Sequence, residues 1–527
     1  MTRVRVPGIG AIVMAGAMVG AAVGPVAAAS SGGWSNLGTG GTATTPPIDG
    51  RVYTTVRVGD KLYVGGDFVN AGGVTGASRI AVWDPAARTW SALGAGIANG
   101  SVTSIIVDGS TVYASGSFDR VGPSGQTLAP SFAVWNGSAW GPVNGQDFNG
   151  PVWALARVGD KLMMGGGFDN AAHLPSADSI VAWDLQAHGW ASITPNNQIT
   201  GTVFALAADG SGGLWMGGTF VDAFGIQAGD RILHWDGVDT FSAVGVGVSG
   251  TVRALVATND GVTAAGDFLN AGGTTGADLV AHWNGSAWSA IGTPKTFLTG
   301  DSIYGLTLDG GDVFVAGIFL NAGGDARMDA VAAYDGVKWR PVGSDAAGAN
   351  GPGVAGRAVA VVGRTLFFGG LDGQIGGGKL NKGIASFRLR QPDVAVGVGA
   401  GAVAGANVYN TTASGQSRSA TVARGGTATF RFVIANDGAL SDTLRFRSTG
   451  SGGGFTATWR TAAGKDVTAA VVAGTYQASV APGARVTLTL KVKAGAAAAG
   501  TRSWKLTATS QEGGAAADAA KAVVSVG

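Results

Sequence analysis

Cysteine is absent from this 527-residue chain, and histidine occurs only four times. Without cysteine the chain can form no disulfide bridge, no thiolate metal site, no cysteine nucleophile and no lipid-modified cysteine anchor. Its stability must therefore come from the burial of apolar side chains. Neither sign of charge is in clear excess, because 35 Lys and Arg residues face 33 Asp and Glu residues. A nearly neutral chain has no net charge to attract nucleic acid, so we expect no nucleic-acid partner.

Long apolar runs are also missing beyond the N-terminus. Arg3 and Arg5 precede an uncharged apolar stretch at 9–23, and alanines at 27–29 offer a small-residue cleavage site. This pattern is typical of a secretory signal peptide, and the run is short for a membrane span. We expect residues 1–29 to be removed and the mature protein to be secreted or associated with the cell wall, without a membrane span. A retained N-terminal anchor is the alternative.

A repeat of about fifty residues dominates the rest of the chain. A phenylalanine after a pair of small residues marks each of six copies, and Gly369–Asp372 is a seventh, degenerate copy. Each copy holds four short segments rich in β-branched and aromatic residues, which are typical of β-strands. Seven four-stranded units of this length predict a seven-bladed β-propeller within an all-β protein. The marker residues are Phe68, Phe118, Phe168, Phe220, Phe268 and Phe319.

Large rings recur where the third predicted strand ends and the fourth begins. Because they occupy the same two places in nearly every copy, we assign them to the core between sheets rather than to a sugar site. At the third strand they are Trp83, Trp135, Trp183, Trp235, Trp283 and Tyr334. At the fourth strand they are Trp90, Trp140, Trp190, Phe241, Trp288 and Trp339.

The segment Val82-Trp83-Asp84-Pro85-Ala86-Ala87-Arg88-Thr89-Trp90 carries a family resemblance. With the glycine pair that ends the second strand, it resembles the kelch repeat of galactose-oxidase-like propellers over residues 33–390. The sequence is also similar to the Phe-x-Asn-Ala-Gly-Gly repeats of microbial surface proteins, through 68–73, 268–273 and 319–324. Both resemblances imply architecture rather than activity. The copper chemistry of one kelch-like oxidase family is not implied, because no Tyr–His cluster is present.

The N-terminus supplies a strand that the last copy lacks. Residues 34–38 repeat the fourth-strand motif of 90–94 without preceding strands, whereas the seventh copy stops after its third strand at 384–387. We therefore predict that an N-terminal strand completes the last blade and closes a propeller over residues 30–392, which removes open sheet edges.

The C-terminal part follows a different pattern. An Ala/Gly/Val stretch over 393–405 is expected to be a linker. Alternating apolar and polar segments separated by turn clusters then predict an Ig-like β-sandwich over 406–527. It is similar to the accessory sandwich modules of extracellular bacterial proteins, which implies a spacer or adhesion role.

Histidines and carboxylates are the candidate groups for catalysis or metal binding. His234 and His282 precede the third-strand ring in adjacent copies, a spacing that fits repeat substitution better than metal ligation. Four aspartates share one register, and their repetition favours a structural role in binding loop N–H groups over glycoside hydrolysis or cation binding. They are Asp178, Asp230, Asp278 and Asp329. No Gly-x-Ser-x-Gly elbow is present. We expect no metal and no cofactor.

One position breaks the repeat, which is where a ligand site is expected. Near the start of the first strand it carries unlike side chains, whereas the next position is always small. Small residues suit crowded inner strands, so the variable side chains should lie at the channel mouth. The candidate ligand-binding residues are Tyr53, Trp153, Phe204, Arg253, Tyr304 and Arg357. The alternative is that they plug the channel.

These observations favour a secreted or cell-surface, non-catalytic protein that recognises a glycan, a wall polymer or a protein at the loop face of the channel. The alternative is an extracellular carbohydrate-active lyase or hydrolase that uses loop carboxylates and arginines. A structural surface-layer component remains a third hypothesis.

Overall fold

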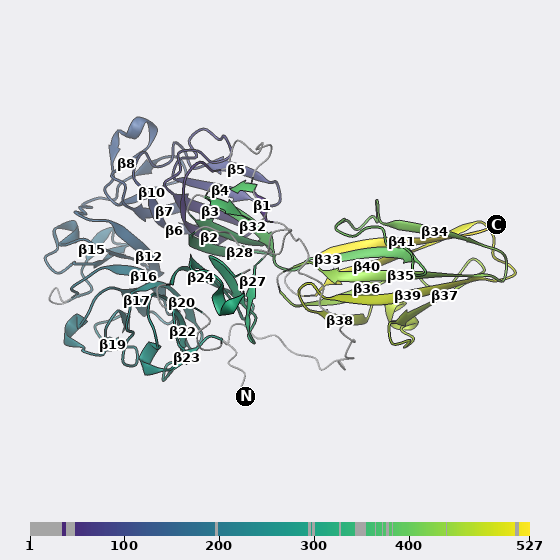
Figure 1. Cartoon of the computed structure of the whole chain (residues 1–527). Helices are drawn as coiled ribbons and strands as arrows, with labels where there is room; N and C mark the ends of the chain where they lie inside the picture. The colour runs from purple at the N-terminus through teal and green to yellow at the C-terminus, as the bar shows by residue number, and fades with distance from the viewer. Residues whose placement is uncertain are drawn as a thin grey trace. The chain divides into compact units, whose positions relative to one another are not determined.

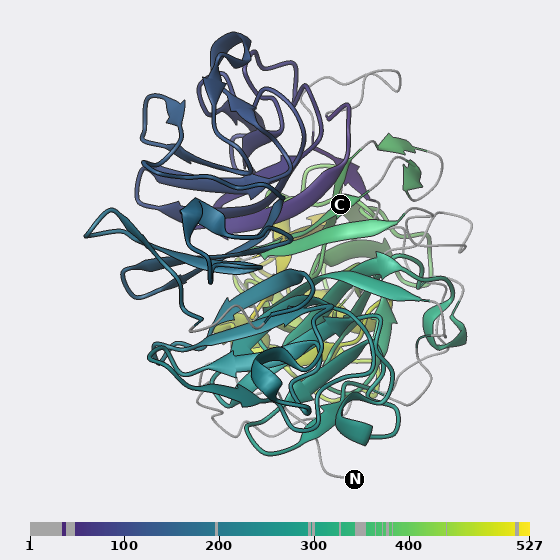
Figure 2. The same ribbon diagram turned by 90° about the vertical axis from the view of Figure 1, so that its left-hand side faces the viewer.

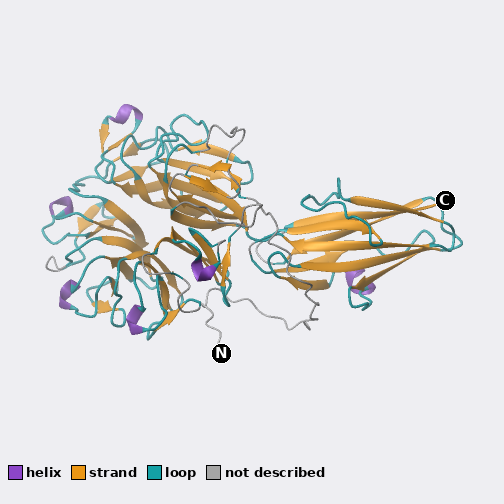
Figure 3. Ribbon diagram, viewed as in Figure 1, coloured by secondary structure: helices purple, strands orange, loops and turns teal. Residues whose placement is uncertain are grey.

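The computed structural model describes residues 34–37, 48–194, 199–292, 297, 301–325, 328–342, 355–363, 365–370, 373–375, 379–381, 383–438, 440–511 and 516–527. The predicted signal peptide lies outside these residues. The described chain divides into two compact units, which meet in sequence between Phe387 and Arg388 (Figure 1). Both consist mainly of strands (Figure 3). Within the described residues, no helix has the length and apolarity needed to cross a membrane.

The described residues of the first unit form seven four-stranded antiparallel sheets. In chain order, six of them are β2 (Val52–Val58), β3 (Lys61–Gly66), β4 (Ile80–Asp84) and β5 (Thr89–Ala92); β6 (Val102–Asp108), β7 (Thr111–Gly116), β10 (Phe132–Trp135) and β11 (Trp140–Gly141); β12 (Val152–Val158), β13 (Lys161–Gly166), β14 (Ile180–Asp184) and β15 (Gly189–Ala191); β16 (Val203–Ala208), β17 (Leu214–Gly218), β18 (Ile232–Trp235) and β19 (Phe241–Ala243); β20 (Val252–Thr258), β21 (Gly261–Gly266), β22 (Val280–Trp283) and β23 (Trp288–Ala290); β24 (Ser302–Asp309), β25 (Asp312–Ile318), β26 (Val331–Tyr334) and β27 (Trp339–Pro341). The seventh sheet joins β28 (Gly356–Val362), β29 (Thr365–Gly370) and β32 (Ile384–Arg388) to β1 (Ser35–Asn36). The two-stranded ribbons β8 (Arg120–Val121) with β9 (Thr127–Leu128), and β30 (Gly373–Ile375) with β31 (Lys379–Asn381), lie outside these sheets.

The repeated apolar residues form the core between the sheets. The six marker phenylalanines are at most 2% exposed, so each is fully enclosed. The rings of the third and fourth strands pack against each other, as in Trp83 with Trp90 at 5.2 Å and Trp183 with Trp190 at 4.9 Å between centroids. The predicted core role is confirmed for eight of the twelve rings, which are buried. The other four are partly buried and pack against the same clusters; they are Trp135, Trp190, Phe241 and Trp283.

The first strands of the seven sheets pack against one another in a closed cycle. Each first strand contacts the first strand of the next sheet, from β2 through β6, β12, β16, β20 and β24 to β28, and β28 contacts β2. Figure 2 shows the sheets of the first unit, whose colour changes from purple through teal to green in chain order. The strand that begins each sheet therefore lies where all the sheets converge.

The N-terminal strand completes the seventh sheet as predicted. β1 pairs antiparallel with β32, with Ser35 opposite Ser386. Trp34 is 2% exposed and its ring lies 5.9 Å from that of Phe368. The indole N–H of Trp90 donates to the carbonyl of Leu37 at 2.8 Å.

That indole bond repeats between other pairs of sheets. Trp140 donates to the carbonyl of Leu93 at 2.7 Å, and Trp288 donates to the carbonyl of Val244 at 3.0 Å. The residues after β1 thus link the seventh sheet to the first as the other sheets are linked.

The second unit consists of two sheets around one core. One sheet has the order β33 (Pro392–Val398), β35 (Thr427–Asn436), β39 (Arg485–Ala494) and β37 (Phe455–Thr461). The other has the order β34 (Ser417–Val422), β41 (Ala517–Val526), β40 (Thr501–Ser510), β36 (Asp442–Arg447) and β38 (Tyr476–Val480), and α1 (Thr468–Ala473) follows β37. Only β34 and β41 run parallel among the pairs described. Alternate side chains from both sheets, including the fully buried Trp459 and Trp504, fill a single core.

The linker predicted over 393–405 is wrong for residues 393–398. β33 occupies 392–398 and pairs along its whole length with β35. Val394 and Val396 are fully buried in the core of the second unit. The alternation that a strand requires was present, but Ala and Gly between the valines made the stretch resemble a flexible connection.

Candidate functional site

All six candidate ligand-binding residues line one pocket. Its volume is about 400 Å³, and every lining side chain is half-buried. Ser101 and Thr103, which the predicted set omitted, complete the lining. The full set is Tyr53, Ser101, Thr103, Trp153, Phe204, Arg253, Tyr304 and Arg357.

The pocket side chains share an unusual backbone position. In every sheet the pairing of the first and second strands shifts register at one residue near the start of the first strand. In β12 the shift lies between Val152 and Ala154, which leaves Trp153 outside the ladder. Such bulges often re-aim a side chain beside a functional site. The seven skipped residues are Tyr53, Thr103, Trp153, Phe204, Arg253, Tyr304 and Arg357.

The residue after each bulge is small because neighbouring first strands approach closely. At Gly305 an added Cβ would lie 3.1 Å from the Cα of Ala358 in the next sheet. Ser104 uses its small hydroxyl to accept the N–H of Leu155 at 3.1 Å. Small residues at this place therefore let the sheets converge, while the bulged residues face the pocket.

Arg253 is held by a carboxylate. Its Nε and Nη2 donate to both oxygens of Asp267 at 2.7–3.0 Å. Burial lowers the pKa of Arg253, but the hydrogen bond and charge of Asp267 outweigh burial, and the pKa is raised above its usual value. The guanidinium also lies 4.7 Å from the centre of the Tyr304 ring. Arg253 is therefore fixed and already neutralised.

Arg357 has no such partner among the described residues. Its guanidinium lies 3.8 Å from the centre of the Tyr304 ring, on the opposite side of Tyr304 in the order of strands from Arg253. Its Nε is buried without a hydrogen bond to any described residue. A guanidinium packed on an aromatic ring keeps its planar donors available to an incoming acceptor.

Tyr53, like Arg253, is paired with a carboxylate. The Tyr53 hydroxyl donates to Asp67 at 3.1 Å, and the backbone N–H of Arg51 donates to the same carboxylate at 2.7 Å. Trp153 and Phe204 lie beside each other with ring centres 6.2 Å apart. The pocket thus combines aromatic faces with one guanidinium that is free of carboxylates in the described structure.

The repeated carboxylates have the structural role that was predicted. Each accepts the backbone N–H of the residue eight positions earlier at 2.6–2.8 Å. At the residues that donate, φ is about 50°, a left-handed conformation that Asn and Asp tolerate. The pairs are Asn170 with Asp178, Asp222 with Asp230, Asn270 with Asp278, and Asn321 with Asp329. None of these carboxylates lines the pocket.

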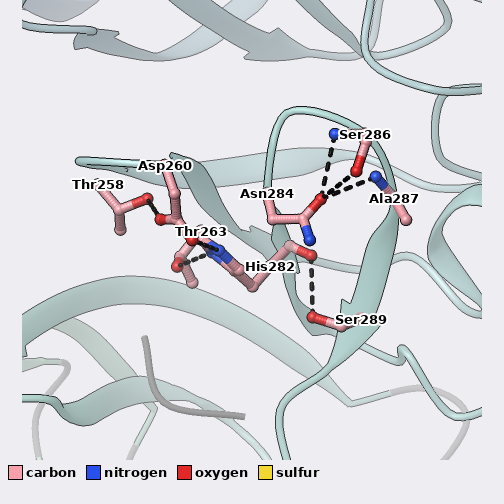
Figure 4. Close-up of polar contacts among 8 residues, drawn as sticks. All are labelled: Thr258, Asp260, Thr263, His282, Asn284, Ser286, Ala287 and Ser289. Atoms are coloured by element: carbon pink, nitrogen blue, oxygen red, sulfur yellow. Dashed lines mark hydrogen bonds and ion pairs between the residues drawn. The ribbon is translucent and has the colours of Figure 1, made fainter. Parts of the chain in front are cut away.

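His234 and His282 each pair with an aspartate in the turn between the first and second strands of their own repeat. Figure 4 shows His282 between Asp260, whose carboxylate is 3.2 Å from Nε2, and Thr263, whose hydroxyl is 3.2 Å from Nδ1. Nε2 of His234 lies 2.9 Å from Asp209. Across the described residues, no group of three or more acidic, histidine or cysteine side chains could hold a metal ion.

Hydrogen bonds hold Asp209 in its ionised form. Burial raises its pKa, but hydrogen bonds from Ser211, His234 and Gly213 outweigh burial and lower the pKa to about 2. A carboxylate held ionised in this way fixes the adjacent hairpin. The sequence contains a pattern that could have predicted this pair. An aspartate in the first turn and a histidine in the third strand occur together in two adjacent repeats.

The second unit also holds a buried acidic cluster that the sequence does not predict. Asp393 on β33 and Asp518 on β41 are 6% and 0% exposed, with Asp437 nearby at 4%. Burial first, and the charges of Asp437 and Asp518 next, raise the pKa of Asp393 to about 7, although the N–H of Asn407 lowers it. Asp518 accepts the N–H of Val394 at 2.6 Å and so ties the first strand of the unit to the last.

No protein-family model and no curated protein matches this chain. Among solved structures, one similar chain is the extracellular domain of a protein described as a hybrid two component system of B. thetaiotaomicron. It is 10% identical, the match covers 92% of this chain and 58% of that chain, and the TM-score is 0.36. The extracellular domain of a one component system of the same organism is 11% identical, with 90% and 80% covered and a TM-score of 0.21. This chain therefore spans under two thirds of the first protein, and at these TM-scores neither likeness bears on fold or function.

Proposed function

We propose that the first unit is a seven-bladed, kelch-like β-propeller and the second an Ig-like β-sandwich, both exported behind a signal peptide. The cycle of contacts among seven first strands and the pairing of β1 with β32 support the closed ring. Two sheets around one core support the sandwich. The N-terminal sequence pattern supports export to the cell surface or the medium.

The function that the site supports best is non-catalytic binding of a glycan in the pocket of the first unit. The observation that carries it is the convergence of six candidate side chains, from six different sheets, on one cavity of about 400 Å³. That volume lies in the range of roughly 300–1,000 Å³ for small-molecule sites. Aromatic faces stack on sugar rings, and guanidinium groups bind polar substituents. A wall polymer presents the same sugar units, whereas a protein partner would require a wider surface.

Binding is favoured over hydrolysis or elimination by where the carboxylates lie. The four aspartates in one register already bind loop N–H groups, and the two carboxylates beside the pocket are bonded to Tyr53 and Arg253. A pair of free carboxyl groups flanking a scissile bond, as glycoside hydrolysis requires, is not found among the described lining residues.

The test is glycan-array binding together with a turnover screen on the same purified protein. We expect binding without turnover, and loss of binding in Trp153→Ala. Leu128→Ala is the matched control, because Leu128 is 57% exposed and lies outside the pocket. Glycan binding that survives in Trp153→Ala, or turnover of a bound glycan, would contradict the proposal.

A further inference from the structure

We propose that the pocket recognises a sugar unit bearing a carboxylate, with Arg357 as the residue that binds the carboxylate and Trp153 as the ring on which the sugar stacks. This inference rests on the proposed function and assigns the ligand class for the same site. It follows from a difference between the two arginines, from the order of the sheets around the pocket, and from the cost of a half-buried cation.

The two arginines are not equivalent. Arg253 makes three hydrogen bonds with Asp267, which occupy Nε and Nη2 and neutralise its charge. Arg357 lines the same pocket, yet its buried Nε finds no acceptor among the described residues. Of the two guanidiniums, Arg357 is therefore the one that can bind an incoming anion.

The sequence explains this difference. In the repeats of Tyr53 and Arg253, the residue fourteen positions later is an aspartate that accepts from the pocket side chain, namely Asp67 and Asp267. Fourteen positions after Arg357 the chain carries Leu371, which has no carboxylate. In sequence, the repeat of Arg357 therefore has no carboxylate at the position that supplies the counter-ion of Arg253.

The order of the sheets places aromatic rings across the pocket from Arg357. The first strands form a cycle of seven, so the strands opposite β28 are β12 and β16. These strands carry Trp153 and Phe204, whose ring centres are 6.2 Å apart. A ligand that fills the pocket therefore meets a guanidinium at one side and aromatic faces at the other.

This arrangement matches a sugar acid. The C–H face of a pyranose ring stacks on an aromatic ring, and a carboxylate accepts two parallel hydrogen bonds from a guanidinium. A half-buried cation without a counter-ion is costly, so a ligand carboxylate would restore the missing charge balance. The planar donors of arginine suit a planar carboxylate in particular.

The experiment measures affinity for paired glycans that differ only at the carboxyl group. The probes are uronic-acid and sialic-acid oligosaccharides, their carboxyl-reduced counterparts, and sulfated oligosaccharides, tested against the full mature chain. We expect the acidic form to bind about tenfold or more tightly than its reduced counterpart, as one charged, bidentate pair implies. Arg357→Ala should remove that preference, so that the acidic and the reduced forms bind with similar affinity.

Two further variants keep the test decisive. Arg357→Lys retains the charge but removes the planar fork, so it should fold normally and lose much of the preference. Arg424→Ala removes one positive charge from an exposed residue of the second unit and should change nothing. Melting temperatures are measured for every variant, so that loss of affinity is separated from loss of fold.

Each of the other possible results contradicts one stated part of the proposal. Equal affinity for acidic and reduced forms, or preference for the sulfated probe, overturns the carboxylate assignment but leaves glycan binding standing. A preference that persists in both Arg357 variants overturns the role of Arg357. No binding to any glycan overturns the proposed function together with this inference.

Discussion

Trp34 offers the sharpest test of how the first unit is closed. It stands immediately before β1, is 2% exposed, and packs on Phe368 and Phe387 with ring centres 5.9 and 5.4 Å away. Its indole N–H has no hydrogen-bond partner among the described residues. Replacing Trp34 with Ala therefore removes packing alone, without stranding a polar partner.

The size of the effect follows from burial. Truncation of a buried Trp to Ala costs about 3–5 kcal/mol, through lost apolar burial and the cavity that remains. Unfolding entropy is roughly 2.1 cal/mol/K per residue, or about 0.7 kcal/mol/K for a unit of some 350 residues. A loss of about 4 kcal/mol then corresponds to a fall in melting temperature of about 5 °C.

The assay is calorimetric unfolding of the mature chain, its Trp34→Ala variant and a truncation that begins at residue 38. The truncation also removes Leu37, whose carbonyl accepts from Trp90, so its melting temperature should fall further. Val238→Ala is the matched control, because Val238 is 77% exposed. Equal melting temperatures for Trp34→Ala and Val238→Ala would refute closure by the N-terminal strand.

Three further predictions concern modularity, pH and the loops. Residues 388–527 expressed alone should fold, with a β-type circular dichroism spectrum and a cooperative melt; a disordered spectrum would contradict the boundary. In that folded fragment the raised pKa of Asp393 means that the native state binds its proton more tightly than the unfolded chain. The resulting stability is fully present below about pH 4 and is lost as pH rises through about 7. Urea titrations at stepped pH should show this fall, Asp393→Asn should flatten it, and exposed Asp466→Asn should retain it. In the first unit, Asp278→Ala should cost about 0.5–1.5 kcal/mol by removing the acceptor of the Asn270 N–H, whereas Asp278→Asn keeps an acceptor and should cost less.

The repeat made much of the first unit predictable. Residues that recur every fifty positions must satisfy the same packing in each copy, so the enclosed Phe68 and the paired Trp83 and Trp90 could be assigned to the core. The fourth-strand motif at 34–38 was informative for the same reason. It has no preceding strands of its own, so it must pair with a sheet formed by a later part of the chain. The carboxylates that bind loop N–H groups were predictable because they obey the repeat.

Features that depend on pairing between distant strands were not predictable. Asp393 and Asp518 come together only because β33 and β41 lie in the same unit, a register that no local pattern records. β33 itself was missed because its small residues resemble a linker, although its valines enter the core. The ion pair between Arg253 and Asp267 was not predictable either, because it depends on the pairing of β20 with β21.

The variability of the pocket position has a physical origin in the bulge. A residue skipped by the ladder contributes no cross-strand pair, so the sheet imposes little preference on its side chain. The next residue, by contrast, faces the neighbouring first strand at van der Waals distance and must stay small, as Gly305 against Ala358 shows. The same bulge in seven sheets thus places two different positions side by side. Packing keeps the side chain small at one of them and does not restrict the side chain at the other. Unlike side chains such as Trp153 and Arg357 could accumulate around the pocket because changing them leaves the sheets intact, and this freedom is what a binding site needs.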